Sequence, residues 1–229
     1  MTRDPGQTQH DLDWDAEVPV SPHYGDSYYS RTDGLAEARH VFLAGNNLPA
    51  RVRDGFHIAE LGFGTGLNLL AALHAFRASG ARGALHYTGF EAHPIPVAAM
   101  QRALAAFPVV AAIAAPLLEW WRDASSPLIL PDLHATVHLG DATRTLPGWN
   151  GHADAWFLDG FAPDRNPALW TPALMTSVAR HTAPGGTFAT YSAAGHVRRA
   201  LAGAGFAVTR LPGHGRKRHM SVGILERRP

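Results

Sequence analysis

The chain of 229 residues contains no cysteine. Disulfides, thiolate nucleophiles and cysteine-ligated zinc sites are therefore excluded. Only 17% of the residues are charged, and the formal net charge of +1 does not by itself predict a nucleic-acid partner. Pro, Arg and His interrupt the alanine-rich stretches, and residues 1–15 lack the apolar core of a signal peptide. We therefore expect a cytoplasmic protein that has no membrane partner.

The residues that are present have a globular composition, with 46% hydrophobic residues and with Pro and Gly spread along the chain. The length suits one α/β domain with a small appendage. Charge is uneven, because residues 4–17 are mainly acidic whereas the C-terminal stretch is basic. Such an asymmetry can mark a face that binds a polyanion, although a solvated helix face followed by a basic tail is the alternative.

Two regions differ in pattern. Residues 1–55 have Pro and Gly between aromatic runs, which predicts an irregular N-terminal extension, or lid, with a short helix near 35–43. Residues 56–229 alternate apolar runs of strand and helix spacing, which predicts a doubly wound α/β domain on which the extension packs. The expected sheet has seven mostly parallel strands and an antiparallel C-terminal strand. Strands are predicted at 56–61, 84–91, 136–139, 153–159, 187–191, 205–211 and 219–225, helices at 67–78, 94–107 and 196–204, and an inserted helix and loop at 116–131.

Acidic residues follow or end four of the predicted strands. They are Glu60, Glu91, Asp141 and Asp159. Ligands in an open α/β sheet bind beyond the carboxyl ends of the strands, so these side chains are expected at one site.

A glycine-rich loop follows Glu60, with the sequence Gly62-Phe63-Gly64-Thr65-Gly66. Its spacing differs from the dinucleotide fingerprint, and the preceding Glu would repel a phosphate. S-adenosylmethionine fits better, because its amino and sulfonium groups are cationic. The loop therefore favours a class I, Rossmann-like methyltransferase over a nicotinamide-dependent oxidoreductase, while a turn that serves packing alone is the alternative.

The carboxylates at the other strand ends suit the rest of such a cofactor. Glu91 is positioned to accept hydrogen bonds from both ribose hydroxyls, and Asp141 from the exocyclic amine of adenine. A solvated turn carboxylate is the alternative for either residue.

Asp159 is the best candidate for a catalytic group. Methyl transfer to an alkylamine needs a neutral nitrogen, and a carboxylate can orient the ammonium form and accept its proton. Phe161 and Trp170 could exclude water or stack on a base, with core positions as the alternative. The 14 histidines form no metal-binding spacing, so no metal is expected.

Several motifs together resemble the methyltransferase domain of the tRNA 5-methylaminomethyl-2-thiouridine biosynthesis (MnmC) family, including its stand-alone MnmD-type members. Phe63 in the glycine loop and the block Asp154 to Pro163 are typical of this family rather than of methyltransferases in general. The remaining matches are Tyr28-Tyr29-Ser30, Asp33-Gly34-Leu35, Glu37, Val41-Phe42-Leu43, Gly45-Asn46, Leu48-Pro49, Ile58 to Asn68, Asn166-Pro167, Trp170, Pro212-Gly213, Gly215, Lys217-Arg218 and Met220.

The resemblance implies N-methylation of 5-aminomethyl-2-thiouridine at the tRNA wobble position, with S-adenosylmethionine as the methyl donor. It implies that the basic C-terminal segment contacts phosphates of the anticodon arm. The expected cofactor-binding residues are Glu60, Gly62, Phe63, Gly64, Thr65, Gly66, Asn68, Glu91, Asp141 and Asp159, the last also catalytic. The expected substrate-binding residues are Tyr28, Asp33, Phe161, Trp170, Lys217 and Arg218.

The chain departs from the family pattern in two respects. Many members carry a C-terminal flavin-dependent oxidase, for which this chain has no room, so we expect no FAD and a separate enzyme that supplies the aminomethyl substrate. Tyr29 stands where Phe is expected, and Gly25 where an acidic residue is expected. Methylation of a small-molecule or protein amine, and a binding module without catalytic activity, are the alternative functions.

Overall fold

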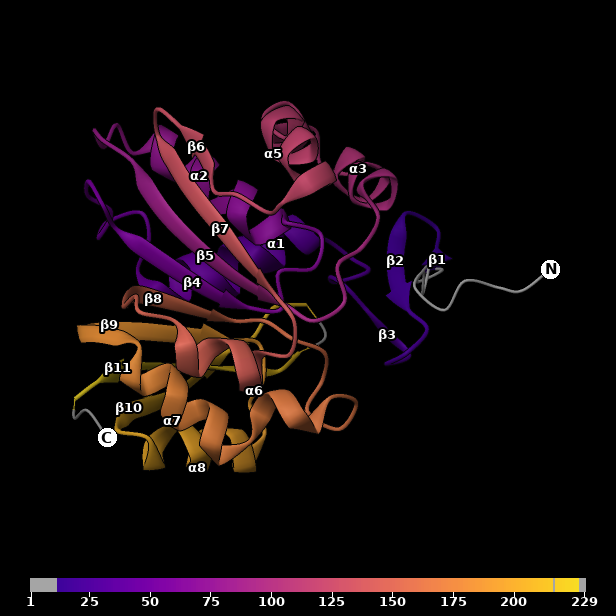
Figure 1. Ribbon diagram of the computed structural model, residues 1–229. Coiled ribbons are helices and arrows are strands. Elements are labelled where there is room, and N and C mark those ends of the chain that lie inside the picture. Colours follow the sequence, from indigo (N-terminus) through magenta and orange to yellow (C-terminus); the bar gives the residue numbers. More distant parts are fainter. Residues whose placement is uncertain (1–11, 216, 227–229) are drawn as a thin grey trace.

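The computed structural model describes residues 12–215 and 217–226. Eight strands form the main sheet in the order β10-β11-β9-β8-β4-β5-β7-β6 (Figure 1). The five central strands, from β9 to β7, are parallel, and β11 is antiparallel to both of its neighbours. The mostly parallel sheet with an antiparallel C-terminal strand is thus confirmed. Its strands are β4 (His57–Leu61), β5 (Leu85–Glu91), β6 (Leu128–Leu130), β7 (Leu133–Leu139), β8 (Ala153–Leu158), β9 (Thr182–Thr190), β10 (Phe206–Pro212) and β11 (His219–Leu225).

The predicted number of seven strands is wrong, because β6 adds an eighth at the sheet edge. This strand lies in the segment 116–131, for which a helix and a loop were expected. Leu130 pairs with Leu133 across a tight turn at Pro131-Asp132, and Leu128 is buried. The short apolar run is therefore held by its hairpin partner and by the core.

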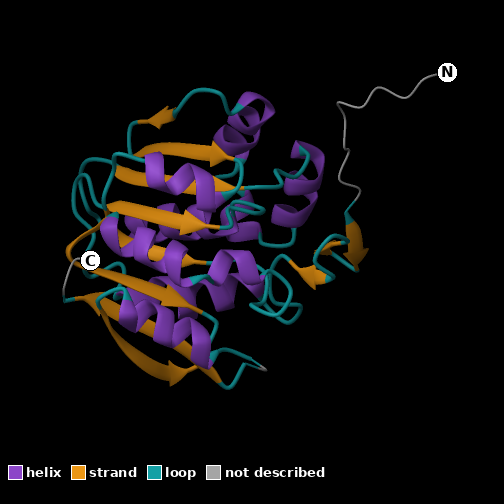
Figure 2. Ribbon diagram, turned by 60° about the horizontal axis from the view of Figure 1, so that its bottom comes forward, coloured by secondary structure: helices purple, strands orange, loops and turns teal. Residues whose placement is uncertain are grey.

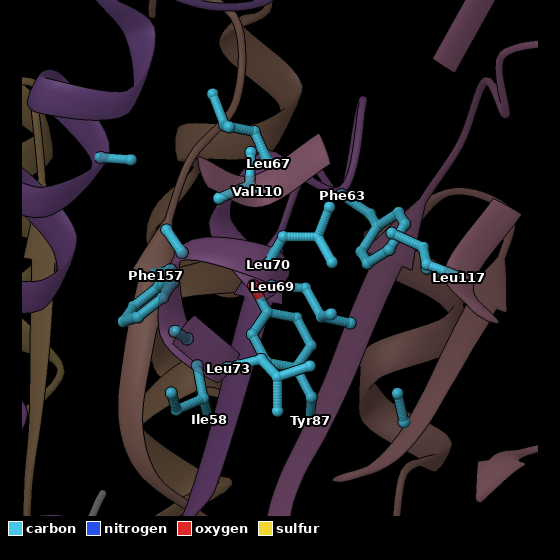
Figure 3. Packing of buried hydrophobic residues seen from close by; sticks show 14 of the residues in the cluster. Ile58, Phe63, Leu67, Leu69, Leu70, Leu73, Tyr87, Val110, Leu117 and Phe157 are labelled. Atoms are coloured by element: carbon cyan, nitrogen blue, oxygen red, sulfur yellow. The ribbon is translucent and has the colours of Figure 1, made fainter. Parts of the chain in front are cut away.

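Helices cover both faces of the sheet (Figure 2). Alternation along the strands directs Ile58 and Phe157 into one hydrophobic cluster, and Ala59 and Trp156 into the other. In the first cluster, Leu69, Leu70 and Leu73 of α2 pack near Ile58 and Tyr87 (Figure 3). The helices are α2 (Leu67–Ala78), α3 (Val97–Ala105), α4 (Pro108–Ala111), α5 (Ala115–Trp120), α6 (Ala142–Thr145), α7 (Pro172–Arg180) and α8 (Gly195–Gly203).

The N-terminal extension is more regular than its sequence indicates. It forms a small antiparallel sheet of β1 (Asp13–Asp15), β2 (Val18–Ser21) and β3 (Asp26–Ser27), which lies beyond the carboxyl ends of the central strands (Figure 1). The expected helix near 35–43 is present as α1 (Gly34–Glu37), which continues into a π-helical segment, Ala38–Leu43. Val41 and Phe42 are buried in the same cluster as α2, so this part of the extension belongs to the core. Among the described residues, no helix is long and apolar enough to cross a membrane.

Candidate active site

The glycine-rich loop lies where β4 ends between its two parallel neighbours. Gly62 N donates a hydrogen bond to Phe90 O of β5 (3.0 Å), and Asp159 N donates one to Leu61 O (3.0 Å). Gly62 has φ +82°, and a Cβ at this position would overlap the main-chain oxygen of Asp159. Only glycine therefore lets β4 turn into α2 while staying this close to the end of β8.

Phe63 holds the loop in place through its side chain, which packs in the hydrophobic core. Its ring is buried and stacks on Trp121, with centroids 5.1 Å apart, and it lies beside Leu117 of α5 (Figure 3). The aromatic residue that distinguishes this loop thus ties it to the segment between β5 and β7.

Glu60 and Asp159 are joined by a single amide. Asn68 Nδ2, on α2, donates hydrogen bonds to Glu60 Oε1 and to Asp159 Oδ2, both at 2.7 Å. Tyr87 Oη donates to the other Glu60 oxygen, also at 2.7 Å. Glu60 has no exposed surface, and burial together with the nearby charge of Asp159 raises its pKa well above the ordinary value. In this arrangement Glu60 fixes Asn68, and Asn68 fixes Asp159.

Glu91, at the end of the neighbouring strand β5, is hydrogen-bonded to the loop. Its carboxylate accepts hydrogen bonds from Gly64 N (2.8 Å) and His93 N (2.7 Å). Burial raises its pKa, and the bonds from the backbone oppose that rise. Each carboxylate oxygen has a second lone pair, so Glu91 can still accept the hydroxyls of a ribose.

Asp141 caps the first turn of α6. Its Oδ1 accepts hydrogen bonds from Thr143 N and Thr143 Oγ1, both at 2.8 Å, while the side chain remains exposed. The other oxygen, Oδ2, is therefore available to an amine in the cavity.

A cavity of about 880 Å³ lies above these groups, between the loop, the ends of the central strands and the extension. It brings together most of the predicted site. The predicted residues that line it are Tyr28, Gly62, Phe63, Gly64, Thr65, Asn68, Glu91, Asp141, Asp159, Phe161 and Lys217.

Five predicted residues do not line this cavity. Glu60 lies beneath it, and Gly66 precedes α2, where a Cβ would overlap the Leu117 side chain. Asp33 caps α1 by accepting a hydrogen bond from Ala36 N (2.8 Å). Trp170 is 2% exposed and donates from Nε1 to Phe161 O (3.0 Å), so it supports the wall from behind. Arg218 is exposed outside the cavity.

On the side of the cavity beyond Asp159, Lys217 forms an ion pair with Glu37. Lys217 Nζ lies 2.9 Å from Glu37 Oε1 and 3.7 Å from the centroid of the Tyr191 ring. Glu37 and Tyr191 have no role in the sequence prediction, although Glu37 is part of the family pattern. No local signal could pair residues 37 and 217, because 180 positions separate them.

Asp159 has an environment suited to proton transfer. Its pKa is raised to about 7, mainly by burial; the hydrogen bond from Asn68 and the charge of Lys217 oppose this rise, and the charge of Glu37 adds to it. Asp159 Oδ1 receives no hydrogen bond from any described residue, so this oxygen is free for a ligand.

Aromatic residues of the extension cover the cavity near Asp159. The Tyr24 ring stacks on Phe161, with centroids 4.5 Å apart, and Tyr28 meets the same ring edge-on at 5.2 Å. Asp26 fastens this segment to the loop after β8 by accepting a hydrogen bond from Ala162 N (3.1 Å). Tyr24 was not predicted, since nothing in its local pattern marks it.

These features fit S-adenosylmethionine. The loop glycines have positive φ and no side chain, so a ligand can approach the main chain. The carboxylates of Glu91 and Asp141 suit hydroxyl and amine donors. S-adenosylmethionine has no phosphate, so no phosphate has to approach a buried acid. Among residues 12–215 and 217–226, no cluster of His, Asp and Glu could hold a metal ion.

Comparison with known proteins agrees with this geometry. The family profile described as S-adenosyl-L-methionine-dependent methyltransferase matches residues 112–226. The tRNA 5-methylaminomethyl-2-thiouridine biosynthesis bifunctional protein MnmC of Stutzerimonas stutzeri is 46% identical over 231 residues, which cover 95% of this chain and 35% of that protein. The protein of the same name from Caulobacter sp. (strain K31) is 46% identical over 225 residues, covering 92% and 37%. The chain thus spans about a third of the length of these curated relatives.

A solved structure shows the same fold. The crystal structure of MNMC2 from Aquifex aeolicus superposes with a TM-score of 0.74 at 24% identity, covering 97% of this chain and 72% of that one. The sequence relatives confirm the resemblance to MnmC proteins. The chain belongs to the family of S-adenosyl-L-methionine-dependent methyltransferases, and its cofactor is S-adenosylmethionine.

Proposed function

We propose that this enzyme transfers a methyl group to the amine of 5-aminomethyl-2-thiouridine at the wobble position of tRNA, forming 5-methylaminomethyl-2-thiouridine. The names of its relatives contain this product. The observation that carries the proposal is the position of Asp159, which lies between the cofactor loop and the aromatic acceptor side of the cavity. A carboxylate at this point suits an acceptor that enters as an ammonium ion.

Bound S-adenosylmethionine supplies a methyl group on a sulfonium, which is a good leaving group. The free Oδ1 of Asp159 attracts and orients the acceptor ammonium, then takes its proton so that the nitrogen lone pair becomes available. Asn68 holds the other oxygen and so fixes the direction of the carboxylate. A pKa near 7 lets Asp159 accept this proton and release it to water within one catalytic cycle.

Apart from Asn68 and Asp159, the ten proposed cofactor-binding residues divide into two groups. Gly62, Gly64, Thr65, Glu91 and Asp141 contact the ligand, whereas Glu60, Phe63 and Gly66 hold the loop in shape. Tyr28 and Phe161 enclose the acceptor base, with Trp170 behind Phe161. Asp33 acts through α1, which it caps.

The partner of this site is the anticodon arm of tRNA. We propose that Arg218 and other exposed basic residues of the C-terminal segment contact its phosphates. Methyl transfer from a sulfonium uses neither FAD nor a metal, and we propose that a separate enzyme supplies the aminomethyl group. A tRNA substrate places the reaction in the cytoplasm.

The test is the transfer of labelled methyl groups to tRNA that lacks this modification, followed by nucleoside analysis. We expect label in 5-methylaminomethyl-2-thiouridine alone. Label on a small-molecule or protein amine, with none in tRNA, would favour the alternative acceptor. Binding of S-adenosylmethionine without turnover on any of these acceptors would indicate a binding module.

A further inference from the structure

The Glu37 and Lys217 pair is built into the wall of the cavity. The two residues come from α1 and from the segment between β10 and β11, and both line the cavity. The Glu37 side chain is 9% exposed and that of Lys217 is 42% exposed. The Glu37 carboxylate is therefore buried in the cavity wall, whereas Lys217 is accessible both to the cavity and to solvent.

Both members keep hydrogen-bonding capacity after they have bonded to each other. A lysine ammonium has three donors, and the Glu37 contact uses one. Among the described residues, none donates a hydrogen bond to the second oxygen of Glu37, Oε2. The cavity wall thus presents a donor and an acceptor side by side.

Resting on the proposed function, we infer that Glu37 and Lys217 read the imide edge of the uracil-type base that carries the acceptor amine. Lys217 donates to the carbonyl oxygen O4, and Glu37 accepts from N3–H. An adjacent carbonyl and N–H on the base match an adjacent ammonium and carboxylate on the protein. Enzymes that act on an unstacked base recognise it through hydrogen bonds to this edge and through aromatic stacking.

Asp159, Lys217 and Glu37 line one cavity and can therefore meet neighbouring groups of a single ring. The aminomethyl group is on C5, next to C4=O, which is next to N3–H. Asp159 takes the amine, and both Lys217 and Glu37 are near enough to influence the charge of Asp159. Tyr191 and Phe161 line the same cavity, so aromatic side chains lie beside the space for the ring.

This role differs from the phosphate contact that the sequence predicts for Lys217. A phosphate at Nζ would approach the Glu37 carboxylate, 2.9 Å away, and the other acids of this cavity wall. A neutral base edge has no such repulsion. Arg218, which is exposed outside the cavity, is better placed for a phosphate.

The test combines changes in the base with changes in the protein. Anticodon stem-loop RNAs carrying 5-aminomethyl-2-thiouridine, or its N3-methyl derivative, serve as acceptors for the wild-type enzyme and for Glu37→Ala and Glu37→Gln. We expect N3-methylation to lower kcat/KM about 10- to 100-fold for the wild type, the loss of one hydrogen bond to a charged group. The penalty should fall below about threefold in Glu37→Ala and be largely restored in Glu37→Gln, which keeps an acceptor.

Lys217→Met provides an independent readout through O4. Replacing O4 by sulfur, a weaker acceptor, should lower kcat/KM for the wild type but change it little for Lys217→Met. Glu119→Gln and Arg122→Met remove charges from an exposed ion pair on α5 and the turn after it, and should keep both penalties at the wild-type level.

The outcomes separate this inference from the proposed function. The wild type could transfer methyl groups to the RNA while N3-methylation and sulfur at O4 lower kcat/KM equally in all variants. That result would overturn the recognition of the base edge and leave the proposed function intact. No wild-type transfer to the aminomethyl RNA would overturn both. If Glu37→Ala does not fold, as judged from its thermal transition, the Lys217→Met comparison decides the result.

Discussion

At the scale of single residues, the sequence predicts which acids meet but not what each one does. Glu60, Glu91, Asp141 and Asp159 could be placed together because parallel strands end at one edge. Glu60 nevertheless lies below the cavity, since alternation puts it on the same face of β4 as Ile58, the face that α2 covers. A strand-end residue has two possible faces, and only the packing of α2 decides between them.

The raised pKa of Asp159 has a consequence for stability. The fold raises this pKa from 3.8 to about 7, so the native state holds a proton that the unfolded chain has released between these pH values. Stability is therefore lost as the pH rises from about 4 to about 7. The cost above pH 7 is about 1–3 kcal/mol, allowing for partial solvent access.

Asp159→Asn removes this cost. As the pH rises from 5 to 8, the free energy of unfolding of the wild type should fall by about 1–3 kcal/mol relative to that of the variant. Urea unfolding at both pH values measures the change, with Asp123→Asn at an exposed position as the control for charge removal. If the variant and the wild type differ in unfolding free energy by the same amount at pH 5 and pH 8, the assigned environment of Asp159 is contradicted.

At the scale of elements, the strongly periodic units could be predicted, whereas helix α7 and strand β6 were missed. The apolar periodicity of α2 and of the central strands is strong, and the structure follows it. Helix α7 was missed, although Thr171 caps it and Pro172 begins it, both of which are signals of a helix start. Strand β6 was missed because a three-residue run has no periodicity, and its pairing with β7 decides its structure.

The turn from β4 to α2 can be tested with two glycines. Gly62→Ala combines an unfavourable φ of +82° with overlap on Asp159 O, and should cost roughly 2–5 kcal/mol. Gly80→Ala has a similar φ of +72° but no atom within 4 Å, and should cost about 1–2 kcal/mol. Chemical denaturation of both variants measures the difference. Equal losses would show that the Asp159 contact does not constrain the turn.

At the scale of the whole molecule, the class of sheet was predictable because strands alternating with helices have few topologies available. The closure of the cavity was not. It depends on contacts between Tyr24 and Phe161, and between Glu37 and Lys217, which join the N-terminal extension to segments 137 and 180 positions away. Long-range pairs of this kind leave no local pattern in the sequence.

The preference for one cofactor can be measured on the whole molecule, because a ligand that binds only the native state stabilises the fold. S-adenosylmethionine at about 100 times its Kd should add about 2.7 kcal/mol. For a domain of this size that corresponds to a rise in Tm of roughly 5–10 °C. NAD at the same concentration should leave Tm unchanged, and Glu91→Ala should reduce the shift produced by S-adenosylmethionine. Stabilisation by NAD would contradict the interpretation of the glycine loop.

We propose that Asp159 prepares a tRNA-borne amine for methylation, at a cofactor site that binds S-adenosylmethionine without this carboxylate. The most direct measurement compares wild type and Asp159→Ala in labelled methyl transfer to tRNA that carries 5-aminomethyl-2-thiouridine, with S-adenosylmethionine binding measured by calorimetry on the same samples. We predict that the variant loses methyl transfer while its Kd for S-adenosylmethionine stays within a few-fold of the wild-type value. Loss of cofactor binding with unchanged turnover at saturating cofactor would contradict the account.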